Sequence, residues 1–352
     1  MMQMEYTTLD KISENLDSKR KPITSSDRVE GKIPYYGASG IVDYVKDYIF
    51  DESLLLVSED GANLLARSTP IAFSVTGKTW INNHAHVLRF SNENLQKFVE
   101  IYLNSISLES YVTGSAQPKL NQKMLNGIPI PVVDDSQIEI IVNSVENLKS
   151  IIEFRKQELA CLDDLIKARF VEMFGSIYDN KYGYNVMTLQ DVCEPIKDGT
   201  HQTPTYTEDT VNGFKFLSSK DVTSGKVDWD HLKYIPEELH NELYKRISPR
   251  KGDILLAKNG TTGVAAIVDR DEVFDIYVSL ALLKPLEMVT AEYLCSAVNS
   301  LETKHQFDHS LKGIGVPNLH LGEIKKTKII VPPIELQKQF ADFVHQVDKS
   351  KI

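Results

Sequence analysis

Two histidines one residue apart are the first candidates for chemistry in this sequence. His84 and His86 fall in a predicted strand, where side chains two positions apart point to the same face. They could share a metal ion, but the neighbouring sequence offers neither a carboxylate nor a cysteine to complete the ligand set. Cys161, Cys193 and Cys295 are too widely spaced for a clustered metal site. We therefore expect no metal, and assign the histidines to packing or phosphate contact.

Motifs of nucleophilic and nucleotide-dependent enzymes are missing. Gly37-Ala-Ser-Gly40 lacks the spacing of the Gly-x-Ser-x-Gly nucleophile elbow, because its second glycine comes one residue early. The sequence has no Walker A loop and no Gly-x-Gly-x-x-Gly after a strand. We therefore expect no catalytic residues.

The composition is that of a globular chain without the bulk charge of a nonspecific DNA binder. The 352 residues are 42% hydrophobic and 25% charged, and 49 acidic residues against 39 basic ones give a net charge of −10. This excludes a histone-like polycation, although a local basic face could still bind DNA. No segment reaches the run of about 20 apolar residues that a membrane span needs, and Met1–Ser18 lacks the apolar core of a secretory signal. We expect a cytoplasmic protein.

The residues just described lie in a sequence that contains an internal repeat. Gly114–Leu120 (GSAQPKL) is echoed by Gly313–Leu319 (GIGVPNL), and Ile128–Pro131 (IPIP) by Ile329–Pro332 (IIVP). The offset stays near about 200 residues, which is the signature of an internal repeat. Two homologous halves follow from this pattern.

Each half combines short apolar runs with one short helix. Turn residues such as Asn259-Gly260 bound the runs, which is typical of strands. The predicted strands are Ser53–Ser58, Ile71–Val75, Ala85–Phe90, Asp253–Ala257, Val264–Val268 and Ser279–Leu283, and the predicted helices are Leu95–Asn104 and Thr290–Ser300. The fold class is therefore α+β, with two repeated, mostly antiparallel sheets.

A long helix is predicted between the halves, over residues 135–175. Apolar residues recur there at alternating steps of three and four, the heptad signature of a coiled coil, and no Pro or Gly interrupts them before Gly175. The apolar seam comprises Ile138, Ile141, Val145, Leu148, Ile152, Leu159, Leu162 and Ile166. An ordinary amphipathic helix rarely runs this far.

A shorter helix of the same kind is predicted after Pro333, over residues 333–352. Its seam is Leu336, Phe340, Phe343 and Val347. An antiparallel pair of helices would place one globular half at each end. The second helix covers only about half of the first seam, and burial of apolar surface at about 25 cal/mol per Å² favours a cover for the rest. We infer a partner, either another subunit or a second copy of this chain.

Together these features resemble the specificity subunit of a Type I restriction–modification enzyme. The motifs that carry the resemblance are Ile33–Gly40 (IPYYGASG), Thr113–Leu120 (TGSAQPKL), Ile128–Pro131, Lys197–His201 (KDGTH), Ala257–Gly263 (AKNGTTG) and Gly313–Leu319. They extend over nearly the whole chain in the order found in the family. The second helix departs from the family pattern, because it is much shorter than the first.

The resemblance implies a non-catalytic subunit built from two target recognition domains, residues 1–134 and 176–332, with the two helices between and after them. Each domain would read one part of a split DNA target, and two methyltransferase subunits would dock on the helices. Those subunits would bind S-adenosylmethionine, whereas ATP and Mg²⁺ would belong to a separate restriction and translocase subunit. The only Pro-Pro pair, in Val331-Pro-Pro-Ile334, is not the Asn/Asp-Pro-Pro-aromatic loop that adenine methyltransferases need.

Candidate DNA contacts follow from residue type. Lys and Arg hold phosphates, whereas amide, hydroxyl and basic side chains reach base edges. The candidates in the first half are Lys19, Arg20, Lys21, Tyr35, Tyr36, Ser39, Lys78, Asn82, Asn83, His84, Gln117, Lys119 and Asn121. Those in the second half are Lys197, Thr200, His201, Gln202, Ser219, Lys220, Lys258, Asn259, Thr261, Thr262, Lys312, Asn318 and His320.

Structural roles compete with these assignments. Lys19–Lys21 could be an ordinary solvated loop, and Asn82 and Asn83 could simply form a turn. Asn259-Gly260 is a hairpin turn signal that is compatible with DNA contact.

The halves differ outside their shared motifs, so we expect an asymmetric, bipartite target. The alternative function is a structural adaptor or a DNA-mimicking anti-restriction protein, which would need regularly spaced carboxylates along one face.

Overall fold

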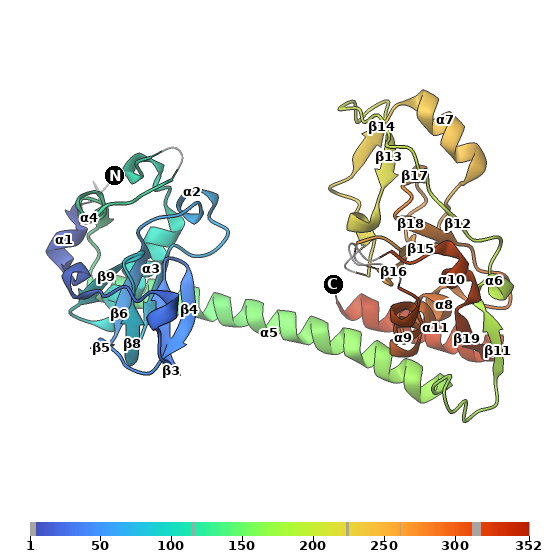
Figure 1. Ribbon diagram of the computed structural model, residues 1–352, viewed down its shortest axis with the longest axis horizontal. Coiled ribbons are helices and arrows are strands. Elements are labelled where there is room, and N and C mark those ends of the chain that lie inside the picture. The colour runs from blue at the N-terminus through green and yellow to red at the C-terminus, as the bar shows by residue number, and fades with distance from the viewer. Residues whose placement is uncertain (1–4, 115–116, 223–224, 261, 312–317, 352) are drawn as a thin grey trace. The chain divides into compact units, whose positions relative to one another are not determined.

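The protein consists of two compact units, residues 1–154 and 155–352. The computed structural model describes residues 5–114, 117–222, 225–260, 262–311 and 318–351. Helix α5 (Asp135–Phe174) is one continuous helix of 40 residues that contributes to both units (Figure 1). No helix of the described part of the chain is both long enough and apolar enough to span a membrane.

The first half is built from two four-stranded sheets and a two-stranded ribbon. The first sheet has the order β2-β9-β6-β7, and the second has the order β4-β3-β8-β5, in which β3 and β8 are parallel. Strand β1 pairs with β10. The elements are β1 (Tyr6–Thr8), α1 (Leu9–Ile12), β2 (Ser13–Asn15), β3 (Glu30–Gly37), β4 (Gly40–Val45), β5 (Phe50–Asp51), β6 (Leu54–Ser58), α2 (Asn63–Ala66), β7 (Ala72–Val75), β8 (Lys78–Ile81), β9 (Ala85–Phe90), α3 (Glu93–Ser105), α4 (Gln122–Asn126) and β10 (Pro129–Pro131).

The second half repeats this topology, except that its second sheet has three strands and lacks a counterpart of β5. Its sheets have the orders β12-β18-β15-β16 and β14-β13-β17, with β13 parallel to β17, and β11 pairs with β19. The elements are β11 (Asn185–Thr188), α6 (Leu189–Val192), β12 (Lys197–Asp198), β13 (Phe214–Leu217), β14 (Lys233–Ile235), α7 (Glu237–Arg246), β15 (Ile254–Ala257), β16 (Ala265–Ile267), β17 (Phe274–Ile276), β18 (Leu280–Leu283), α8 (Ala291–Val298), α9 (Leu301–Ser310), α10 (Leu321–Lys326), β19 (Lys328–Val331) and α11 (Ile334–Ser350).

The repeat and the α+β class predicted from the sequence are therefore confirmed. All six predicted strands and both predicted helices are present, with bounds that differ by at most two residues. The expectation of one helix per half after the last of these strands was wrong, because α4 follows α3 in the first half, and α9 and α10 follow α8 in the second. Ser300 caps α9 by accepting a hydrogen bond from the Thr303 backbone, so the chain turns into a new helix there.

The central sheet of each half is buried on both faces. In β6, Leu55 and Val57 pack into the cluster that includes α3, whereas Leu54 and Leu56 pack into the cluster formed with the second sheet. Alternation along β15 divides its side chains between two clusters in the same way. Side chains of a strand alternate between faces, so a doubly covered strand must be apolar at every position. This is why these strands read as unbroken apolar runs.

Local signals set the ends of α5. Asp134 accepts a hydrogen bond from the Gln137 backbone at 2.9 Å, which caps the first turn. Gly175 has a φ of +72°, the left-handed conformation that ends many helices, and its N–H bonds to the Val171 carbonyl. Pro333 precedes α11, where its missing N–H costs nothing.

The second unit pairs the C-terminal part of α5 with α11 in antiparallel orientation. The Arg155 guanidinium donates to the Lys351 carbonyl at 2.9 Å, and the rings of Phe170 and Phe340 lie 5.6 Å apart. The predicted antiparallel pair of helices is therefore present over this stretch. Its core includes Phe174, which contacts the ring of Phe340.

The predicted seam of α5 is covered unevenly. Ile138 is buried and Ile141 is packed against the first core, whereas Leu148 and Ile152 are 59% and 54% exposed. Val145, Leu159, Leu162 and Ile166 are half-buried. On α11, Phe340 and Val347 are buried, and Leu336 and Phe343 are half-buried. The middle of α5 thus presents apolar side chains to its surroundings.

Candidate nucleic-acid interface

Five segments of the first half meet at one end of its sheets. They are residues 19–21, 37–40, 58–61, 82–86 and 117–121, which contain most of the DNA contacts predicted for this half. The hydroxyl of Ser58, at the end of β6, donates to the Ala38 carbonyl at 2.5 Å. This bond joins the second segment to the third.

Glu59 joins the remaining segments. The Leu120 N–H donates to its carbonyl at 2.8 Å, and its own N–H donates to the His84 carbonyl at 2.9 Å. Its carboxylate accepts from the Arg20 guanidinium at 2.6 Å. Residues that lie far apart in the sequence therefore form one surface.

The second half assembles the equivalent segments in the same way. They are residues 197–202, 218–220, 258–260, 277–279 and 318–320. The Lys258 N–H donates to the Ser279 carbonyl, and the Leu319 N–H donates to the Lys258 carbonyl at 2.7 Å. The Ser219 N–H donates to the Ser279 hydroxyl, and the Lys258 ammonium lies 3.4 Å from Asp198. Each half therefore presents a cluster of five loop segments.

His86, the last residue of segment 82–86, has both ring nitrogens within hydrogen-bond distance of protein oxygens. Its Nδ1 is 2.5 Å from the Asp17 carboxylate and its Nε2 is 2.7 Å from the Leu120 carbonyl. Both ring nitrogens are thus engaged by protein oxygens, and neither is free for a metal ion. The side chain is buried, so the predicted choice between packing and phosphate contact resolves to packing.

The carboxylates beside His86 come from distant parts of the chain, which the local sequence could not reveal. Asp17 and Glu59 lie with His86 in a group that could in principle hold a cation. Arg20 and Lys119 neutralise this group, because their nitrogens lie 2.6 and 3.1 Å from Glu59 oxygens. Among the described residues this group is an ion-pair network rather than a metal site.

Electrostatics favour the charged form of both carboxylates. Burial raises the pKa of Asp17, but hydrogen bonds from His86 and the Val87 backbone outweigh it and hold the pKa below its usual value. Burial also raises the pKa of Glu59, and hydrogen bonds from Arg20 and Lys119 reverse that effect. His84, by contrast, is exposed and bonds to Asp60 at 2.9 Å.

Several predicted DNA contacts have buried side chains. Tyr35 is 1% exposed, and its hydroxyl accepts a hydrogen bond from the Ile23 N–H. Asn82 is 7% exposed and accepts from the His84 N–H, and Lys258 is 5% exposed beside Asp198. In this structure these side chains shape the loops from below, and the half-buried Arg20 guanidinium is engaged by Asp17 and Glu59. We therefore remove them from the set of direct contacts.

Two further candidates lie apart from the cluster or have another task. Lys78 begins β8, at the end of the strand opposite Asn82, and its ammonium lies 4.7 Å from the centre of the Tyr48 ring. Asn121 caps α4 by accepting a hydrogen bond from the Met124 N–H at 3.0 Å.

The remaining candidates are exposed or half-buried and lie in the two clusters or directly beside them. In the first half they are Lys19, Lys21, Tyr36, Ser39, Asn83, His84, Gln117 and Lys119. In the second half they are Lys197, Thr200, His201, Gln202, Ser219, Lys220, Asn259, Thr262, Asn318 and His320. Thr261 and Lys312 lie outside the described residues.

The sequence analysis missed Arg246 on α7. Its guanidinium donates to the carbonyls of Asp198 and Gly199, at the base of a predicted DNA-contacting loop. No sequence pattern connects these positions, because 48 residues separate Asp198 from Arg246.

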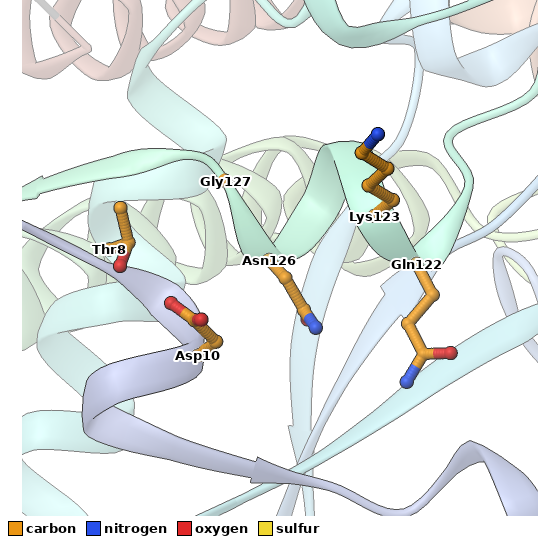
Figure 2. Close-up of a pocket in the computed structure, with 6 residues that line it drawn as sticks. All are labelled: Thr8, Asp10, Gln122, Lys123, Asn126 and Gly127. Atoms are coloured by element: carbon orange, nitrogen blue, oxygen red, sulfur yellow. The ribbon is translucent and has the colours of Figure 1, made fainter.

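An open polar hollow lies between α1 and α4, away from the residues predicted to contact DNA. Its walls are Thr8, Asp10, Gln122, Lys123, Asn126 and Gly127. Figure 2 shows the side chains of Gln122 and Asn126 on one side of α4 and that of Lys123 on the other. Nothing about its lining indicates a particular ligand.

A family comparison accounts for both halves. The model of the Type I restriction modification DNA specificity domain matches residues 1–163 and again residues 181–352. The chain therefore belongs to this family. It is a specificity subunit of a Type I restriction–modification system, the component that recognises the DNA target within the complex, and by family it is non-catalytic.

Two relatives extend over most of the chain. A putative type I restriction enzyme specificity subunit of Haemophilus influenzae, S.HindORF215P, is 28% identical and covers 98% of this chain and 88% of its own length. The MjaVIII specificity subunit of Methanocaldococcus jannaschii is 23% identical and covers 95% of this chain and 83% of its own length.

Solved structures share the fold. The S subunit of a Type I restriction–modification system from M. genitalium superposes with a TM-score of 0.59 at 14% identity, covering 99% of this chain and 90% of its own. A chain from a study of complex assembly and conformational transition in the type I R-M system gives a TM-score of 0.58 at 14% identity, covering 100% and 91%.

Proposed function

We propose that each half of this subunit reads one part of an asymmetric, bipartite DNA target through its cluster of five loop segments. The observation that carries the proposal is the repeated placement of these segments in two halves of the same topology. Their exposed side chains differ between the halves. The same scaffold therefore offers two different sets of hydrogen-bonding groups to base edges.

Charge and spacing support this proposal. The exposed lysines at positions 19, 21 and 119 and at position 197 can hold phosphates in spite of the net charge of −10. A helix of 40 residues is about 60 Å long, and successive DNA turns are about 34 Å apart. Lysines in the loops also argue against a DNA mimic, which would place carboxylates there.

We further propose that the apolar middle of α5 docks the methyltransferase subunits. Leu148, Ile151 and Phe154 are each more than half exposed on this helix. Exposed apolar side chains of this size at helical spacing are typical of a helix that packs against a partner. S-adenosylmethionine would then be bound by the partner, and ATP and Mg²⁺ by the restriction subunit.

An exchange of domains tests the proposal. Residues 1–134 are replaced by the corresponding domain of another specificity subunit, with the junction just before α5 begins at Asp135. Mapping of methylated adenines in DNA from cells that carry the complex should show a change in one half of the target. The other half should stay as it was, because its reading loops belong to the second half.

The reciprocal exchange, of residues 176–332, serves as the matched control and should change the other half of the target. A change in both half-sites after either exchange would contradict the assignment of one half-site to each half. Unaltered half-sites after both exchanges would contradict it equally.

A further inference from the structure

Helix α7 is an addition of the second half. In the first half, Val45 ends β4 and Leu54 begins β6, and the connection between them contains only the short strand β5. In the second half the corresponding connection, between β14 and β15, contains α7. A ten-residue helix in one repeat and not in the other indicates a task particular to that half.

His240 fixes α7 to the second sheet of this half. Its ring stacks on Phe214 with centroids 3.7 Å apart and an interplanar angle of 5°. Its Nδ1 lies 2.7 Å from the Asp275 carboxylate on β17, and both side chains are buried. The helix is therefore held in place from its middle, and its last turn has a defined position.

Arg246, the last residue of α7, forms hydrogen bonds with the backbone at the base of the loop that follows β12. The Arg246 guanidinium donates to the Asp198 carbonyl and, at 3.0 Å, to the Gly199 carbonyl. In return, the Lys197 ammonium donates to the Arg246 carbonyl at 3.2 Å. Carbonyls in the last turn of a helix lack partners within the helix, so a lysine there is a favourable cap.

The other side of the loop base rests on β17. A Cβ atom at Gly199 would lie only 2.0 Å from the Ile276 carbonyl oxygen, so the backbones approach as closely as glycine allows. The Thr200 N–H donates to the same carbonyl at 3.1 Å, and the Val278 N–H donates to the Thr200 carbonyl. The loop base is thus clamped between β17 and Arg246.

We propose that Arg246 is a positioning residue for target reading by the second half. It sets the direction in which Thr200, His201 and Gln202 leave the loop base. Base readout depends on side chains placed to within a fraction of an ångström. When the loop base is released on one side, we therefore expect the complex to lose discrimination between DNA sequences more than overall DNA affinity. This inference rests on the proposed function of the loop clusters.

The test uses the subunit assembled with its methyltransferase partners. Methylation rates are measured on DNA that carries the target and on variants with single base changes in each half-site. Arg246→Gln should reduce discrimination in the second half-site by about tenfold, within the range of one base contact, and leave the first half-site unaffected. Lys245→Gln, which removes the neighbouring exposed cation of α7, should leave both half-sites unaffected.

A second variant separates positioning from phosphate contact, since the Arg246 side chain is about half exposed. Both bonds come from one nitrogen, Nη2, of the planar guanidinium. Arg246→Lys keeps the charge, but its compact ammonium on a flexible stem does not reproduce the fixed direction of these two bonds. We expect it to lose discrimination in the second half-site while the salt dependence of binding is unchanged. Wild-type discrimination in Arg246→Lys, or a uniform loss across all DNA variants in Arg246→Gln, would overturn the proposal.

Failure of this inference is distinct from failure of the proposed function. If the wild-type complex discriminates in both half-sites and Arg246→Gln does the same, only the positioning role is refuted. If the wild-type complex does not discriminate at all, the proposed reading function itself is refuted. Thermal unfolding of each variant complex serves as the control that separates a loss of discrimination from a loss of fold.

Discussion

The two halves place opposite charges at the same point of the same fold. The carbonyl of Glu59 accepts the Leu120 N–H in the first half, and that of Lys258 accepts the Leu319 N–H in the second. The Glu59 side chain lies within a network of cations, whereas the Lys258 ammonium lies 3.4 Å from Asp198. The polar side chains beneath the loops therefore differ between the two halves, although the strand order is the same.

This difference shows that topology and loop support are separable in this fold. The central strands form from apolar runs that are buried on both faces, and such runs tolerate exchanges among Leu, Ile and Val that conserve volume. The loops need only a charge-balanced, hydrogen-bonded layer below them. The central side chain of that layer can be an acid in one half and a base in the other. A fold of this kind can change its recognition surface without changing its core.

The largest expected effect comes from breaking the network of the first half. Glu59→Gln leaves Arg20 and Lys119 without their shared anion and should lower the free energy of unfolding by about 3 kcal/mol. The only two tryptophans, Trp80 and Trp229, lie one in each half. Urea unfolding in a Trp229→Phe background therefore reports on the first half.

Glu14→Gln is the matched control, because Glu14 pairs with Arg89 but is mostly exposed. An exposed pair contributes less than about 1 kcal/mol, so this variant should shift the transition only slightly. If Glu59→Gln costs no more than Glu14→Gln, the network does not support the first half.

The pH dependence of stability should have opposite signs at two buried aspartates. For Asp17, burial is outweighed by hydrogen bonds from His86, and the folded pKa lies below 3.8. The ionised Asp17 side chain therefore stabilises the fold at pH values above its unfolded pKa. This stabilisation is lost as the pH falls through the folded pKa. For Asp275, burial dominates over the bond from His240 and raises the pKa above 3.8. Its contribution to the free energy of unfolding is therefore largest when the carboxyl is protonated and is lost as the pH rises.

Urea unfolding between about pH 3 and pH 6 measures this difference. The cost of Asp17→Asn should grow with pH over that range, whereas the cost of Asp275→Asn should shrink. Parallel pH profiles for the two variants would refute the contrast between the two buried pairs.

The smallest expected effect separates two lysines of the first half that the sequence treats alike. Lys21 lies in the loop cluster and Lys78 at the far end of β8. Lys21→Ala should weaken DNA binding by the assembled complex about fivefold for all sequences and lower the slope of log affinity against log salt by about one. Fluorescence anisotropy at several salt concentrations measures both quantities.

Lys78→Ala removes the same charge from the same half and should leave affinity and slope unchanged. An equal loss in both variants would mean that the surface that contacts DNA extends beyond the loop cluster.

Prediction from the sequence succeeded for features with local causes. The strand of residues 85–90 was predicted without error because its apolar run is bounded by turn residues. Helix α5 was predicted to within one residue, since Asp134 and Gly175 supply its start and stop signals. The candidate site was predicted only in part, because residue type does not reveal whether Tyr35 or Lys258 is buried.

By itself, the sequence determined the duplication, the doubly buried strands and the long helix. These features follow from periodicity and capping, which act between neighbours along the chain. The tertiary structure alone decided which polar side chains face outward, that Asp17 and Glu59 enclose His86, and that Arg246 holds Gly199. Such contacts join residues dozens of positions apart, and their partners are set by how the loops converge once the sheets have packed.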